Sequence, residues 1–133
     1  MSKKAIDYIR KGLQEQRRNT NTLFGRDIVL VSSPLPEHIN LDTVLRRVEN
    51  YIPSVLAREV DAVYIGDFDL LKKREIKAYY YHGAIYLSND QENENDMFDD
   101  LLHEIAHAME TLLRDRIYND GLLEKEFLEK RRL

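Results

Sequence analysis

The segment HEIAH, from His103 to His107, carries the side chains with the clearest chemical potential in the sequence. On a helix, residues four apart lie one above the other on the same face, so His103 and His107 are expected side by side. Two imidazoles at this separation suit one zinc ion, with each nitrogen at about 2.0–2.1 Å from the metal. Glu104 follows His103 and lies about 100° further around the helix, so it can reach a metal-bound water without ligating the metal.

This arrangement predicts metal-assisted hydrolysis of a carbonyl compound. Zinc lowers the pKa of bound water toward 7, and a carboxylate beside it takes the proton as the water attacks. HEIAH matches the H-E-x-x-H pattern, which places two ligands and a general base on one helix. The chain has no cysteine, so histidine and carboxylate must supply every ligand. The alternative is an ordinary helix whose two histidines are hydrogen-bonded or exposed to solvent.

Apolar residues surround the motif at helical spacing. They form two stripes, Leu101, Ile105, Ala108 and Leu112, and Leu102, Ala106, Met109 and Leu113. The stripes predict a helix that is buried over most of its surface and leaves His103, His107 and Glu110 on a narrow polar edge. Such an edge, opening on a cleft, is the geometry that a metal site needs, and it favours zinc binding over the ordinary helix.

The third protein ligand is the least defined part of the predicted site. Catalytic zinc usually takes three protein ligands and one water. Glu126 is the candidate on the following helix, and Glu124 and Glu129 compete with it. Two alternatives stay open: Glu126 is a solvated charge on an amphipathic helix, or the chain lacks a C-terminal portion that would supply the ligand.

Three further residues of the motif helix are candidates for supporting roles. Glu110 lies one turn beyond His107, and we expect it to neighbour the ligands or to form a wall of the cleft. Arg114 and Tyr118 could stabilise an oxyanion. The alternative for both is an ordinary position on the surface of the helix.

The elements expected around this helix predict an α+β fold. Helices are expected over 3–18, 40–52, 122–133 and the long motif-bearing segment, and strands over 26–31 and 60–68, with a hairpin over 75–88 that turns at His82–Gly83. This order predicts a small mixed or antiparallel sheet packed on helices, with residues 1–133 forming a single domain.

HEIAH on a late helix, preceded by the strand AIYLS, resembles the zincin metallopeptidases. More loosely, the layout looks like the lethal-factor type of zincin domain and like phage-encoded metallopeptidases, over residues 27–118. The resemblance implies a zinc-dependent peptidase in which His103 and His107 bind Zn²⁺ and Glu104 is the general base. A gluzincin arrangement would make Glu126 the third ligand.

The resemblance also implies where a substrate binds. In zincins the strand before the active helix is a sheet edge that pairs with an extended peptide. The corresponding segment here is Ala84–Ser88, so Ala84, Ile85 and Tyr86 are the expected substrate-binding residues. The alternative function is a non-catalytic zincin-like interaction or structural module, including a viral one.

Composition limits the other classes of function. The chain has 133 residues and a formal net charge of −4, which gives no general attraction to nucleic acid. We therefore expect no nucleic-acid partner, whereas the resemblance to zincins implies a peptide or protein substrate. No membrane partner is expected, and the oligomeric state stays open. The sequence shows no signal-peptide pattern and no run of about 18 apolar residues. The expected location is the cytoplasm, or the host cytoplasm or virion if the chain is phage-encoded.

Overall fold

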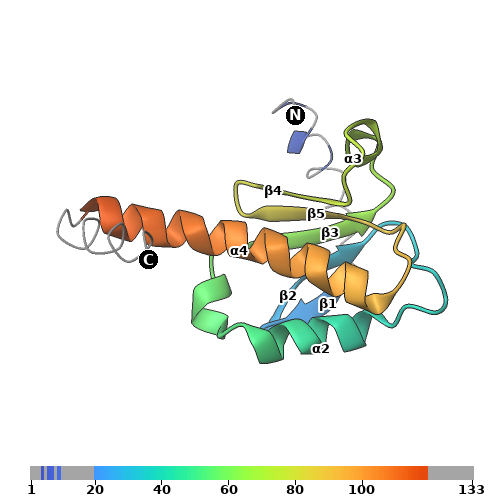
Figure 1. Cartoon of the computed structure of the whole chain (residues 1–133), viewed down its shortest axis with the longest axis horizontal. Helices are drawn as coiled ribbons and strands as arrows, with labels where there is room; N and C mark the ends of the chain where they lie inside the picture. The colour runs from blue at the N-terminus through green and yellow to red at the C-terminus, as the bar shows by residue number, and fades with distance from the viewer. Residues whose placement is uncertain (1–3, 5, 8, 10–19, 120–133) are drawn as a thin grey trace, which may run out of the picture.

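A five-stranded mixed sheet forms the centre of the computed structural model shown in Figure 1. The structure describes residues 4, 6, 7, 9 and 20–119, with only the backbone of 115–119. The elements are β1 (Thr20–Leu23), β2 (Arg26–Val31), α2 (Leu41–Tyr51), η2 (Ser54–Ala57), β3 (Ala62–Gly66), α3 (Asp69–Lys73), β4 (Ala78–Tyr81), β5 (Ala84–Ser88) and α4 (Glu94–Asn119). In this part of the chain, no helix is both long enough and apolar enough to cross a membrane.

The strand order is β1-β2-β3-β5-β4. The three central strands β2, β3 and β5 are parallel, and β1 and β4 pair antiparallel to them at the two edges. The prediction of a small mixed sheet packed on helices is therefore confirmed. The prediction that Ala84–Ser88 forms a sheet edge is wrong, because β5 lies between β3 and β4.

The position of β5 inside the sheet, with β4 at the edge, has a physical cause. The β5 sequence AIYLS is a nearly continuous apolar run, and its residues Ala84 to Leu87 are buried. A strand that is apolar on both faces suits the interior of a parallel sheet. The β4 residues are only partly buried, which suits an edge. A turn in which His82 (φ 46°) and Gly83 (φ 84°) adopt left-handed backbone angles joins the two strands.

Helices α2 and α4 cover one face of the sheet, together with η2 (Figure 1). Alternate strand residues such as Val63, Ile65, Ile85 and Leu87 enter the core on this side. The opposite face carries a smaller apolar cluster that includes Tyr64, Tyr86 and residues of α3. The larger core packs against α4, so it determines which face of the motif-bearing helix is buried and which faces solvent.

Local signals define most of the helix ends. The Asn40 side chain accepts a hydrogen bond from the Thr43 backbone N–H at the start of α2, and the helix ends before Pro53. The Asn93 Oδ1 atom accepts a hydrogen bond of 2.8 Å from the Asp96 N–H at the start of α4. Glu94 and Asp96 lie in the first turn of α4, where carboxylates interact favourably with the helix dipole.

The structure confirms the predicted strands over 26–31 and 60–68, the hairpin, the helix that follows Asn40 and the long motif helix. The elements β1, η2 and α3 were not predicted. Of the predicted helix over 3–18, the described residues 4, 6, 7 and 9 are helical, and the others lie outside the described part. The predicted helix over 122–133 also lies outside it.

Candidate metal site

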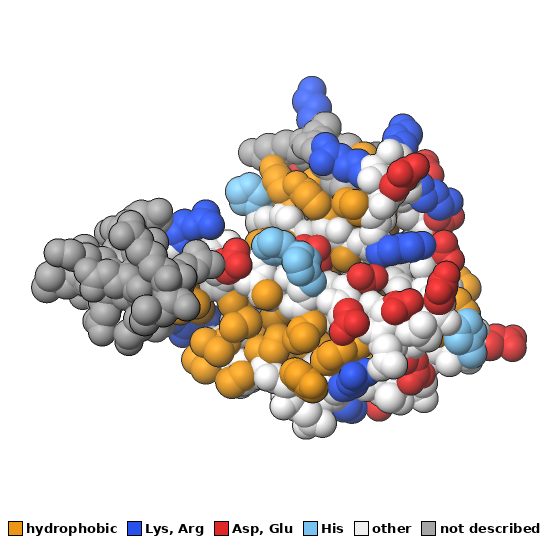
Figure 2. Space-filling model, viewed as in Figure 1, with side chains coloured by type: hydrophobic (Ala, Val, Ile, Leu, Met, Phe, Trp, Pro, Cys, Tyr) orange, Lys and Arg blue, Asp and Glu red, His pale blue; other side chains and the backbone are white. Residues whose placement is uncertain are grey.

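The packing of α4 decides which of its residues face solvent. Met97, Leu101, Ile105 and Ala108 are fully buried in the main core. They occupy successive turns on one side of the helix, so the residues on the opposite side are held at the surface. His103 and His107 lie there and are both exposed. Histidine side chains are accordingly visible on this face of the molecule (Figure 2).

The two imidazoles converge through their Nε2 atoms. These atoms are 3.1 Å apart, which is also a hydrogen-bond distance between the two rings, and the ring planes are perpendicular. Two nitrogens at 2.0–2.1 Å from one tetrahedral ion would be about 3.3 Å apart. The observed separation is therefore close to that of two imidazoles that bind the same zinc ion. Three neighbouring residues, His103, Glu104 and His107, each offer one ligand atom, and these atoms lie within 4.8 Å of one another. This group could hold a metal ion.

Glu104 lies on the inner side of the two histidines. Only 8% of its surface is exposed. Burial raises the pKa of its carboxyl group above the ordinary value, and interactions with His107, His103 and the Tyr80 backbone partly oppose the rise. A carboxylate that takes up a proton more readily than a free glutamate is suited to general base chemistry.

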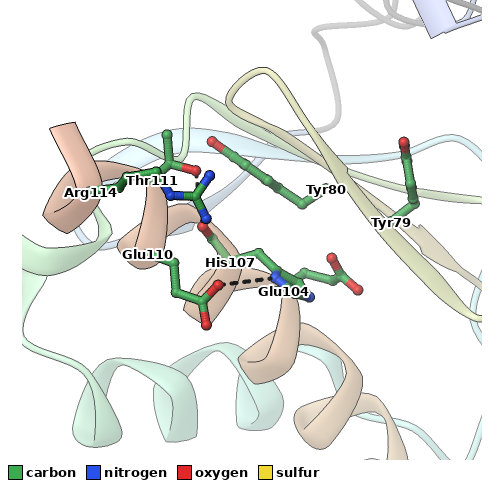
Figure 3. A pocket seen from close by; sticks show the side chains of 7 residues that line it. All are labelled: Tyr79, Tyr80, Glu104, His107, Glu110, Thr111 and Arg114. Carbon is green, nitrogen blue, oxygen red and sulfur yellow. Dashed lines mark hydrogen bonds and ion pairs between the residues drawn. The ribbon is translucent and has the colours of Figure 1, made fainter. Parts of the chain in front are cut away.

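A cavity of about 330 Å³ opens between α4 and the edge strand β4 (Figure 3). Its walls are formed by Tyr79, Tyr80, Glu104, His107, Glu110, Thr111 and Arg114. The cavity therefore places the proposed general base and one of the two histidines beside β4, the edge strand of the sheet formed by the described residues. The predicted cleft beside the motif helix is present.

Glu110 contacts the side of His107 that faces away from His103. Its Oε2 atom lies 3.7 Å from His107 Nδ1, and both side chains are about half exposed. A metal-binding histidine commonly donates its second ring N–H to a carboxylate, which holds the ring and leaves the other nitrogen free for the metal. Glu110 has this position relative to His107, and it also lines the cleft, as the sequence predicts.

We expect Glu110→Gln to weaken zinc binding by about tenfold, because the amide supports the Nδ1–H form of His107 less well than the carboxylate does. Competition with a chromophoric chelator measures the affinity. Asp99→Asn is the matched control, since it removes another exposed carboxylate of the same helix. Equal zinc affinity in the wild type and Glu110→Gln would contradict this role for Glu110.

The structure brings together only some of the predicted site residues. His103, Glu104 and His107 are adjacent, and Arg114 lines the same cleft. Three proposed or competing ligands, Glu124, Glu126 and Glu129, lie outside the described residues, and only the backbone of Tyr118 is described. The proposed substrate residues Ala84, Ile85 and Tyr86 are buried in β5 and do not line the cleft.

Sequence reasoning missed three residues of the cleft. Thr111 lies one helical turn beyond His107, so its spacing could have revealed it. Tyr79 and Tyr80 could not be found in this way, because their role depends on β4 being the edge strand. No protein-family model matches the chain, and comparisons with curated proteins and with solved structures also give no match.

Proposed function

We propose that this protein is a zinc-dependent peptidase of zincin type. The observation that carries the proposal is the convergence of His103 Nε2 and His107 Nε2 to 3.1 Å beside the buried carboxylate of Glu104. This group of two imidazoles and one carboxylate lies at an open cleft rather than inside the core. Peptide or protein would be the substrate, because an extended chain can lie between α4 and the sheet edge.

The residues present fit a zinc ion. His103 and His107 would hold it through Nε2, and Glu110 would orient His107. When bound, zinc would lower the pKa of a water molecule and polarise the substrate carbonyl. Glu104 would accept the proton at its carboxylate and later release it to the leaving nitrogen. The raised pKa of Glu104 suits a group that both accepts and releases a proton.

The free edge of β4 replaces β5 as the proposed substrate-binding strand. The Ser88 N–H donates to the Lys77 carbonyl at 2.7 Å, so Lys77 faces β5. In an antiparallel pair of strands, the backbone N–H and C=O groups of every second residue point toward the partner strand. The backbone groups of Ala78 and Tyr80 therefore point away from β5. The Tyr80 backbone N–H interacts with the Glu104 carboxylate, so an extended peptide would pair with the Ala78 groups and the Tyr80 carbonyl, beside the cleft that contains Glu104.

Glu126 stays the proposed third ligand. Helix α4 continues from His107 to Asn119, about 18 Å along its axis. Residues 120–126 would therefore have to return over most of that length. Seven extended residues span at most about 23–25 Å, so Glu126 can reach the site only if residues 120–126 are mostly extended. The helix predicted from residue 122 onward would then have to begin later in the chain.

Cleavage of a diverse peptide library, followed by mass spectrometry, tests the proposed function. We expect products from the zinc-loaded protein, loss of cleavage after zinc is removed by a chelator, and recovery when zinc is restored. Cleavage that resists the chelator would indicate a contaminating enzyme. Stoichiometric zinc without cleavage of any peptide would instead favour the non-catalytic zincin-like module.

A further inference from the structure

Arg114 is the cationic residue at one end of the cleft. It lies seven positions after His107, about 10.5 Å further along the helix axis and within about 20° of the same face. Its side chain is exposed and lines the cleft together with Thr111 and Tyr80. Figure 3 shows the guanidinium turned back toward the turn of helix that contains His107. The positive charge is thus directed along the cavity rather than away from it.

The carboxylate that should pair with Arg114 is engaged elsewhere. Glu110 lies four residues earlier, the spacing at which a glutamate and an arginine commonly pair on a helix. Its carboxylate instead faces His107 Nδ1 at 3.7 Å. Within the described part of the chain, no acidic side chain lies at ion-pair distance from Arg114. The other carboxylate that lines the cleft, Glu104, is buried beside the histidines.

We propose that Arg114 makes this site selective for peptides that bear a carboxylate within about three residues of the bond to be cleaved. This inference rests on the proposed peptidase function. A guanidinium matches a carboxylate with two parallel hydrogen bonds, which suits selection better than a single point charge. The backbone positions of His107 and Arg114 are about 10.5 Å apart along the axis, about three residues of extended chain at 3.3 Å each, and the guanidinium turns back from this distance toward His107.

The carboxylate can come from two sources, and the direction of the bound peptide decides between them. The chain in β4 runs toward the hairpin turn, in the same direction as α4 toward its C-terminal end (Figure 1). A peptide antiparallel to β4 would place its N-terminal half near Arg114, so the carboxylate would belong to an aspartate or glutamate side chain. A parallel peptide would bring its C-terminal α-carboxylate there.

Pairs of peptides that contain a cleavage site found in the library, and that differ only in one carboxylate, test the inference. One pair has Glu or Gln one to three residues before the cleaved bond, and the other has a free or amidated C-terminus. In the wild type we expect one carboxylate-bearing peptide to be preferred over its neutral match. Arg114→Gln should reduce this ratio of kcat/KM values by about fivefold to tenfold, as expected for a partly exposed ion pair with charged hydrogen bonds. Arg58→Gln, which removes an exposed arginine that does not line the cleft, should preserve the ratio.

The pattern of losses separates selection from other roles. An equal loss on charged and neutral peptides would indicate that Arg114 stabilises an oxyanion or the fold, and it would overturn the inference. An unchanged ratio in Arg114→Gln would overturn it as well. Arg114→Lys should keep part of the preference, because it retains the charge but loses the two-pronged geometry.

Binding to the zinc-loaded Glu104→Gln variant provides a readout that does not need turnover. Fluorescence anisotropy of the same labelled peptides should show the carboxylate preference, and adding Arg114→Gln should abolish it. Carboxylate-selective binding without cleavage by the wild type would reject the proposed peptidase function and leave the role of Arg114 standing. Cleavage without any charge preference would support the proposed peptidase function and overturn the inference about Arg114. Failure of every peptide to bind would overturn the inference about Arg114.

Discussion

Replacing both histidines of the motif, in the variant His103→Ala/His107→Ala, should remove zinc from the protein almost completely. Elemental analysis should give about one zinc per chain for the wild type and close to none for the variant, because the two Nε2 atoms that converge to 3.1 Å are lost. Both proteins would be purified alike and without a histidine tag. Both side chains are exposed, so the fold should survive and unfolding curves should change little.

The chain offers a matched control for this experiment. It contains four histidines, and the other two, His38 and His82, lie outside the candidate site. The variant His38→Gln/His82→Asn should therefore retain zinc. Zinc lost equally from both double variants, or absent from the wild type after incubation with the metal, would contradict the site.

The third ligand can be identified by comparing the zinc affinity of Glu126→Gln with that of Glu124→Gln and Glu129→Gln, measured by competition with a chelator.

Glu104→Gln should reduce turnover by about 10²–10⁴-fold while zinc content stays near the wild-type value. The amide preserves the size of the side chain but cannot accept the proton, so the substitution tests proton transfer rather than shape. The measurement is kcat on the best peptide from the library, accompanied by elemental analysis of the same sample. A large loss with zinc retained would assign the general base to Glu104.

Asp100→Asn is the matched control for Glu104→Gln. Asp100 lies one turn earlier on α4, and burial raises the pKa of its carboxyl group, as it does for Glu104. It does not line the cleft, so its replacement should leave turnover close to the wild-type value. Comparable losses in both variants would point to a general effect of removing a carboxylate that is shielded from solvent. Full activity of Glu104→Gln would exclude Glu104 as the general base.

The features that depend on neighbours along the chain could be predicted from the residues alone. The four-residue spacing of His103 and His107 places them on one side of any helix. The predicted apolar stripe that contains Leu101, Ile105 and Ala108 is buried. The second predicted stripe is exposed at Ala106 and Leu113, so the prediction that most of this helix is buried is wrong. Asn40 and Pro53 mark the ends of α2, and His82–Gly83 marks the hairpin turn. These interactions span a few residues, so the local pattern was enough to predict them.

The way in which those elements combine into a cleft depends on contacts between segments that are distant in sequence. A hairpin sequence does not state which of its strands joins the rest of the sheet, because that choice depends on pairing between β5 and β3, which are distant in sequence. This choice buried Ala84, Ile85 and Tyr86, and it left β4 as the edge beside α4. The burial of Glu104 and the position of Arg114 at the end of the cleft follow from the same long-range packing, which no spacing within one helix encodes.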